Sequence, residues 1–262
     1  METRKVWEKV NYTVEGDGNP VVLLHGYLES LEIWNDFAGI LAKDFHVIRI
    51  DLPGHGKSKV IAEIHTMELL ADAVFHILQK ENIKKPVLAG HSLGGYVTLA
   101  FVEKYAGYLS GFCLFHSHPL ADTDEVRENR KREISLIREG KKRLIYRVNV
   151  PKAFALENQE KFRKEISRAI EIAKNTPDEG IKAMLMGMMR RPDRRNILED
   201  PPLPGLWILG EKDQYIPYER MRSVIKPGKG LQVVSLKKSG HMGFIEEKKS
   251  SLDIMTGFLN TL

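Results

Sequence analysis

The sequence has no long hydrophobic run, and its 262 residues include a single cysteine, Cys113. A membrane-spanning helix needs about 20 consecutive apolar residues, so the sequence predicts no membrane span. The stretch from Met1 to Trp7 contains no apolar segment of the kind that forms the centre of a secretory signal. A lone cysteine cannot form a disulfide within the chain, which is typical of a reducing compartment. Together these features predict a cytoplasmic protein.

The sequence also lacks a concentrated basic patch, although its net charge is +5 at pH 7. Residues 117–200 hold 20 Lys and Arg against 15 Asp and Glu, and the rest of the chain holds 20 of each. A protein that binds nucleic acid usually has a denser basic stripe with aromatic or motif support. We therefore expect no nucleic-acid partner. The surplus is interpreted as a solvated helical face, which is also compatible with an anionic substrate.

Short apolar runs bounded by turn residues predict the strands of a buried parallel sheet. These runs lie at Val21–Leu24, Val47–Ile50, Val87–Gly90, Gly111–Phe115, Leu206–Leu209 and Leu231–Leu236, and the alternating stretch Lys5–Val14 predicts a further strand or hairpin. Helices with one apolar face are predicted at Thr66–Gln79, Leu93–Lys104 and Ser250–Leu262. Alternating strands and helices are typical of βαβ units. The sequence therefore predicts an α/β fold with a mostly parallel central sheet and helices on both faces.

From about Pro119 to Asp200 the sequence contains no clear strand, and apolar residues recur among charged ones at helical spacing. Helices are predicted there at Glu128–Arg147, Gln159–Asn175 and Pro177–Arg190. A block of this length is too long for a simple crossover between two strands. We interpret it as a helical lid inserted into the core. The predicted parts are the first part of the core at 1–117, the lid at 118–200 and the second part of the core at 201–262.

The segment Gly90-His91-Ser92-Leu93-Gly94-Gly95 follows a predicted strand directly and precedes a predicted helix. A GxSxG pattern in this setting is typical of a nucleophile elbow. The tight turn holds Ser92 in a strained backbone conformation, and Gly90 and Gly94 leave room where side chains would collide. The N-terminus of the following helix also favours developing negative charge. The pattern predicts Ser92 as a nucleophile.

Residues 21–116 and 206–247 resemble the α/β-hydrolase superfamily, with motifs in the family's order. The matching motifs are His25-Gly26-Tyr27 after a strand, the segment Asp51 to Ser58, the elbow, Gly210-Glu211-Lys212-Asp213 and Gly240-His241-Met242. The resemblance implies the fold and the catalytic machinery of a serine hydrolase. It is unspecific for the substrate.

The resemblance implies a base and an acid for Ser92, whose hydroxyl is neutral at pH 7 and needs a base to become nucleophilic. Of the nine histidines, His241 lies in a glycine-flanked loop after the last predicted strand, where the family places its base. Asp213 stands at the family's acid position and would orient the His241 ring. Some members carry the acid after the preceding strand, which leaves Asp122 and Asp124 as alternatives.

The resemblance also implies two backbone N–H groups that bind the oxyanion, those of Tyr27 and Leu93. Candidates for substrate contacts near the predicted site are His25, His91, His116, His118, Met184 and Met188. His25 and His91 can equally bond within their own loops, and the methionines can equally pack between helices. His116 and His118 have no third ligand at a sensible spacing, so we expect neither a metal nor a cofactor.

These residues predict a serine hydrolase that cleaves a carboxylic ester of a small molecule through an acyl-serine intermediate. Serine at position 92 argues against epoxide and haloalkane hydrolases, which resemble the chain elsewhere but carry aspartate there. Tyr96 argues against certain menaquinone-pathway members, which carry an arginine at that position. Thioester or carbon–carbon bond hydrolysis on the same residues remains open, as does a ligand-binding receptor with little turnover. The acyl group, the leaving group and the oligomeric state do not follow from the sequence.

Overall fold

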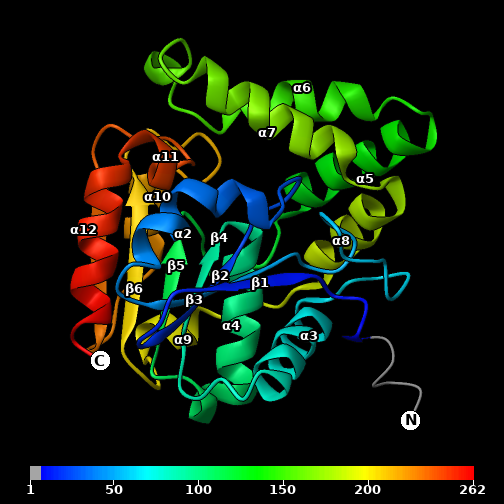
Figure 1. Cartoon of the computed structure of the whole chain (residues 1–262). Helices are drawn as coiled ribbons and strands as arrows, with labels where there is room; N and C mark the ends of the chain where they lie inside the picture. Colours follow the sequence, from blue (N-terminus) through cyan, green and yellow to red (C-terminus); the bar gives the residue numbers. More distant parts are fainter. Residues whose placement is uncertain (1–6) are drawn as a thin grey trace.

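The computed structural model describes residues 7–262 and contains a sheet of seven strands in the order β1-β3-β2-β4-β5-β6-β7 (Figure 1). Neighbouring strands are parallel, except that β1 pairs with β3 in the antiparallel sense. The strands are β1 (Tyr12–Glu15), β2 (Pro20–Leu24), β3 (His46–Ile50), β4 (Val87–His91), β5 (Gly111–Phe115), β6 (Gly205–Gly210) and β7 (Leu231–Leu236). The six apolar runs of the sequence are thus confirmed as strands. The predicted α/β class is confirmed as well.

Helices cover both faces of the sheet (Figure 1). One layer contains α3 (Met67–Lys80) and α4 (Leu93–Tyr105), and the other contains α2 (Asn35–Leu41) and α12 (Lys248–Leu259). Side chains of a strand alternate between the two layers, because successive residues point to opposite faces. In β2, Val22 and Leu24 pack with the core cluster of α3 and α4, whereas Val21 and Leu23 pack with that of α2 and α12. Burial on both faces explains why the strands are continuous apolar runs.

Two parts of the sequence-based prediction need correction. The alternating stretch Lys5–Val14 yields only the strand β1, since residues 7–9 form a helical turn; Lys5 and Val6 lie outside the described residues. The helix predicted at Glu128–Arg147 is two helices, because the chain turns at Gly140, where φ is +71°. A glycine reaches this left-handed conformation without steric cost, and it interrupts the helical periodicity.

The segment between β5 and β6 is helical throughout its regular elements. It contains α5 (Asp124–Arg138), α6 (Lys142–Lys152), η3 (Leu156–Asn158), α7 (Arg163–Asn175), α8 (Asp178–Arg190) and α9 (Arg195–Glu199). Helices α5, α6 and α7 lie together beyond one end of the sheet (Figure 1). The remaining short elements are η1 (Leu31–Trp34), η2 (Ala106–Tyr108), α10 (Tyr218–Val224) and α11 (Gly243–Glu246). Among residues 7–262, no helix is long and apolar enough to cross a membrane.

Helix α8 contacts the loop that follows β3 through two glycines. A Cβ atom on Gly180 would lie 1.9 Å from the carbonyl oxygen of Gly54, and one on Gly187 would lie 1.7 Å from that of His65. The backbone N–H of His65 also donates to the carbonyl of Ala183, at 3.0 Å. The helix and the loop therefore approach each other at a distance that only glycine permits.

Replacing Gly187 by alanine is expected to lower the free energy of unfolding by about 1–3 kcal/mol, because the new methyl group overlaps a backbone atom that cannot rotate away. The matched control is Gly257→Ala in α12, where nothing lies within 4 Å of the added Cβ. That change should be neutral or stabilising by up to about 1 kcal/mol, since alanine favours a helix. Urea unfolding of the two variants measures the difference. Equal stabilities would contradict the close approach of α8.

Candidate active site

Ser92 lies on the sharp turn between β4 and α4, with φ of 49° and ψ of −112°. A positive φ is unusual for a residue with a side chain and stores backbone strain. Two contacts with the end of β5 hold the turn: the N–H of Ser92 donates to the carbonyl of Phe115 at 3.0 Å, and the hydroxyl of Ser117 donates to the carbonyl of Ser92 at 2.7 Å. The strain is thus held in place by the neighbouring strand.

The glycines around Ser92 are required by close backbone contacts. A Cβ on Gly90 would lie 2.1 Å from the carbonyl oxygen of Gly94, and one on Gly94 would lie 2.6 Å from the carbonyl oxygen of Leu24. The chain therefore turns from strand to helix within a space that excludes any side chain. This agrees with the steric interpretation of the GxSxG pattern.

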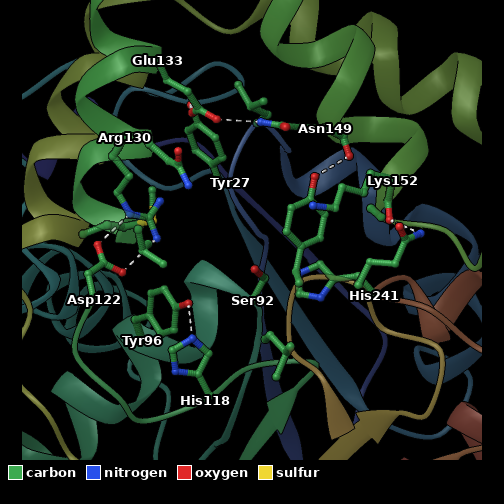
Figure 2. Close-up of a pocket in the computed structure, with 18 of the residues that line it drawn as sticks. Tyr27, Ser92, Tyr96, His118, Asp122, Arg130, Glu133, Asn149, Lys152 and His241 are labelled. Carbon is green, nitrogen blue, oxygen red and sulfur yellow. Dashed lines mark hydrogen bonds and ion pairs between the residues drawn. The ribbon is translucent and has the colours of Figure 1, made fainter. Parts of the chain in front are cut away.

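His241 follows β7 and is joined to Asp213, which follows β6. Its Nδ1 lies 2.7 Å from Oδ2 of Asp213, and both side chains are buried. The other carboxylate oxygen of Asp213 accepts the backbone N–H groups of Tyr215 and Ile216, at 2.8 and 2.9 Å. Because the carboxylate accepts the proton of Nδ1, Nε2 of His241 is left as the acceptor of the ring. His241 and Ser92 line the same cavity (Figure 2).

Burial and charge oppose each other in this pair. Burial lowers the pKa of His241, but the charge of Asp213 and the hydrogen bond to it outweigh burial, so the pKa lies above 6.5. Burial raises the pKa of Asp213, but His241 and the backbone donors bring it below 3.8. Asp213 is therefore ionised at neutral pH, and it favours a protonated His241.

The backbone N–H groups of Tyr27 and Leu93 donate to no protein acceptor in the described part of the chain. Tyr27 follows β2, and Leu93 is the first residue of α4. Tyr27 lies three residues after the end of β2 and Leu93 two residues after the end of β4, and the carboxyl ends of these parallel strands meet at one edge of the sheet. Two free N–H groups near a strained serine are the donors that an oxyanion needs.

The helical segment also supports the His241 loop. The N–H of His241 donates to the carbonyl of Ala153, just after α6, at 2.7 Å. A Cβ on Gly240 would lie 2.5 Å from the backbone nitrogen of Ala155, so the two loops are in backbone contact. Residues 153–155 are therefore part of the structure that positions the ring.

A cavity of about 780 Å³ opens above Ser92. Its walls combine the loops that follow β2, β4, β5, β6 and β7 with side chains of α5 and α6. A cavity of this size suits a small molecule. The pocket is therefore formed by the core and the helical segment together.

Hydrogen bonds connect two core loops across the helices that roof the cavity (Figure 2). The hydroxyl of Tyr27 donates to Glu133 of α5 at 2.8 Å, and the side-chain amide of Asn149 of α6 donates to the other oxygen of Glu133 at 2.9 Å. The hydroxyl of Tyr215 donates to the carbonyl of Asn149 at 2.9 Å. We call the four residues Tyr27, Glu133, Asn149 and Tyr215 the roof bridge.

Three of the predicted substrate contacts are wrong, because the residues do not line the cavity. His25 is buried, with Nδ1 bonded to the carbonyl of Gly26 and Nε2 accepting the N–H of Leu52. His116 is buried beneath the His241 loop, where its Nε2 accepts the N–H of Gly243 at 3.2 Å. Met184 is fully buried in the core. These side chains pack the fold instead.

The other three predicted contacts, His91, His118 and Met188, do line the cavity. Both ring nitrogens of His91 have partners, at 3.0 Å from Glu29 and 2.9 Å from the carbonyl of His241. His91 therefore supports the His241 loop. Substrate contacts of the three residues stay a prediction.

The alternative acids are placed elsewhere. Asp122 is bonded to Arg130 and Arg191, and Asp124 is an exposed residue at the start of α5. Neither carboxylate is bonded to His241, whereas Asp213 is. Within the residues that the structure describes, no three His, Cys, Asp or Glu side chains are grouped to hold a metal ion.

Several cavity residues were missed in the sequence analysis. They are Tyr96, Arg130, Glu133, Asn149, Arg191 and Tyr215. Each owes its place to packing between distant segments, so no local pattern marks it. The basic surplus of residues 117–200 was the one indication of the arginines.

Comparison with known proteins places these features in a family. A family model described as "Alpha/beta hydrolase family" matches residues 21–249. A thermophilic esterase from Thermogutta terrifontis, solved with malate bound, has 29% identity and a TM-score of 0.91 and covers 96% of this chain and 93% of its own.

Two curated relatives match nearly the whole chain. The dihydrolipoyllysine-residue acetyltransferase component of the acetoin cleaving system of Pseudomonas putida is 28% identical over 92% of this chain. This chain spans only 64% of that component's length. The pimeloyl-[acyl-carrier protein] methyl ester esterase of Methylococcus capsulatus is 26% identical over 93% of this chain and 96% of its own.

The Asp213–His241 contact predicts the titration of the ring. In the Asp213→Asn variant the largest influence that raises the pKa of His241 is lost while burial remains, so this pKa should fall. NMR titration of the histidine Cε1–H signals measures the change. Asp124→Asn, which alters an exposed carboxylate, is the control and should leave this pKa in place. A His241 pKa that responds to Asp124 and not to Asp213 would reverse the assignment.

Proposed function

The chain belongs to the alpha/beta hydrolase family, and from this premise we propose that it is a serine hydrolase that cleaves carboxylic esters of small molecules. The catalytic residues of this proposal are Ser92, His241 and Asp213. The observation that carries it is the buried Asp213–His241 hydrogen bond, on the wall of the cavity that holds the strained Ser92. Relatives named as esterases support the ester as substrate.

In the first half-reaction, Oγ of Ser92 attacks the ester carbonyl while Nε2 of His241 accepts the hydroxyl proton. The carbonyl oxygen becomes an oxyanion and accepts the N–H groups of Tyr27 and Leu93. The tetrahedral intermediate then breaks its bond to the leaving oxygen, and His241 returns the proton to that oxygen. An alcohol leaves, and the acyl group stays on Ser92.

In the second half-reaction a water molecule replaces the alcohol. Nε2 of His241 accepts a proton from the water as it attacks the acyl carbonyl, and the same two N–H groups bind the second oxyanion. The bond to Oγ breaks, and His241 returns the proton to Ser92. The carboxylic acid leaves, and the starting state is restored.

The electrostatics of the site fit these steps. The ionised Asp213 stabilises the imidazolium that forms in each half-reaction, and it fixes the tautomer in which Nε2 is the acceptor. Each oxyanion donor is worth on the order of 10²–10³ in rate. The donors are backbone groups whose positions are set by the fold, so they need little reorganisation as charge develops.

We also propose that residues 118–200 act as a lid on a core formed by 1–117 and 201–262. Support comes from their helices α5 and α6, which contribute to the cavity walls, and from the roof bridge, which ties them to core loops. The lid would determine which acyl and alcohol groups fit.

Replacing Ser92 by alanine should remove labelling by a fluorophosphonate probe and lower kcat for a p-nitrophenyl ester at least about a thousandfold, since the nucleophile is lost. The fold should be retained, because the hydroxyl carries no packing. Mass spectrometry of the labelled peptide and burst kinetics provide the measurements. Ser223→Ala, on the exposed helix α10, is the matched control. A wild type in which the probe fails to label Ser92, or which shows no burst, would favour a binding protein with little turnover. Equal labelling of Ser92→Ala would assign the reactive nucleophile to another residue.

The rate should also depend on pH through His241. Since its pKa lies above 6.5 and the neutral ring is the base, kcat/KM should rise with pH as the ring loses its proton and level off above that pKa. In Asp213→Asn the rising limb of the pH profile of kcat/KM should move to lower pH, and kcat should fall on the order of 10³–10⁴-fold. Steady-state pH profiles test both. A wild-type limb that Asp213→Asn leaves in place would assign it to another group.

A further inference from the structure

One wall of the cavity carries a cluster of polar side chains that the proposed reaction does not use. We call Tyr96, His118, Asp122, Arg130 and Arg191 the arginine wall; they come from α4, the segment after β5, α5 and the end of α8. In Figure 2 the labelled members lie on the opposite side of Ser92 from His241. A substrate held at Ser92 therefore has this wall on one side and the base on the other.

The arginine wall carries a net positive charge. Asp122 accepts Nε of Arg130 at 2.7 Å and Nη1 of Arg191 at 2.6 Å. Burial raises the pKa of Asp122, but the two guanidinium groups outweigh burial and bring it below its usual value, so the carboxylate is ionised. Two cations and one anion leave a charge of about +1, in a partly buried site where water screens it weakly.

Each guanidinium keeps a nitrogen without a partner. In the described part of the chain, Nη1 of Arg130 and Nη2 of Arg191 donate to no protein group, and neither is among the fully buried polar atoms that lack a partner. Both side chains line the cavity, so these N–H groups have access to it. Arg191 is held rigidly, because its guanidinium also stacks 4.0 Å from the centre of the Tyr96 ring.

The hydroxyl of Tyr96 supplies a further hydrogen-bond donor to the cavity, because the tautomer of His118 fixes the direction of the bond between them. Nδ1 of His118 accepts the N–H of Leu120 at 3.1 Å, and burial lowers the pKa of the ring to about 3. The neutral ring therefore carries its proton on Nε2, which lies 3.1 Å from the Tyr96 hydroxyl and donates to it. The phenolic proton of Tyr96 is left to donate into the cavity.

Two other acids of the cavity wall already have partners. Glu29 accepts the N–H of Gly26 at 2.6 Å and is paired with His91, and Glu133 belongs to the roof bridge. They are not bonded to the arginine wall. Its positive charge and its free donors are thus available to a ligand.

We propose that the arginine wall is a subsite for a carboxylate, and that the substrates are esters that also carry a free carboxylate. This inference rests on the proposed ester hydrolysis at Ser92. Charge-assisted hydrogen bonds from guanidinium and phenol groups match the two oxygens of a carboxylate. The carboxylate can belong to the acyl side, as in a half-ester of a dicarboxylic acid, or to the alcohol side, as in an acylated hydroxy acid.

The test compares matched ester pairs that differ only in the carboxylate. Acyl-side pairs are the monomethyl and dimethyl esters of succinic, glutaric and adipic acids. Alcohol-side pairs are acetoxyacetic and 3-acetoxypropionic acids and their methyl esters. We expect kcat/KM for the carboxylate form to exceed that for the neutral form at least tenfold in one series, and the better series identifies the side. A wild type that prefers the neutral form throughout would overturn the proposal.

Variants locate the effect. Arg130→Met should lower the preference for the carboxylate form about tenfold or more. Tyr96→Phe should lower it a few-fold. Arg127→Met, which removes a guanidinium from α5 outside the cavity wall, should retain it. If Arg130→Met does not fold, the effect of Tyr96→Phe on the preference for the carboxylate form decides whether the subsite exists. A preference that both variants retain would refute the subsite.

Calorimetry with Ser92→Ala separates the subsite from the reaction. Glutarate and adipate should bind to this variant, and binding should weaken at least tenfold when Arg130→Met is added. Binding without turnover of any ester would refute the proposed hydrolysis and keep the subsite. Turnover of neutral esters without dicarboxylate binding would keep the hydrolysis and refute the subsite.

Discussion

The buried hydrogen bond between Asp213 and His241 is the contact on which the rest of the site depends. It joins the loops after the last two strands, and it forms only because parallel strands bring those loops to one edge of the sheet. The same edge carries the strained turn of Ser92. A side chain at Gly90 or Gly94 would collide with the backbone of that turn or of β2. Sheet topology, turn sterics and one ion pair therefore define the arrangement of Ser92, Asp213 and His241 together.

Much of this arrangement could be predicted from the sequence. Six strands were found because burial on both faces makes them continuous apolar runs, and Ser92 because its turn needs glycines at fixed positions. Asp213 and His241 were assigned through the order of the family motifs. The break at Gly140 and the true length of β1 were missed, since charged helices and short edge strands leave a weak pattern.

The walls of the cavity could not be predicted, for a physical reason. Arg130 and Arg191 meet at Asp122 only after α5 and α8 have packed, and the free proton of Tyr96 follows from a backbone contact of His118. Such contacts join segments far apart in the chain and depend on rotamers and tautomers. The motif residues are therefore predictable from local patterns, whereas the walls of the cavity depend on long-range contacts.

The contact between the His241 loop and residue 153 has a consequence for how such a site can diversify. The helical segment offers a main-chain carbonyl to the N–H of His241, and every amino acid carries that group. Side chains around residue 153 can therefore change, and the shape of the cavity can change with them, while the hydrogen bond to the N–H of His241 persists. Mutations can in this way reshape the cavity without breaking the Asp213–His241 contact.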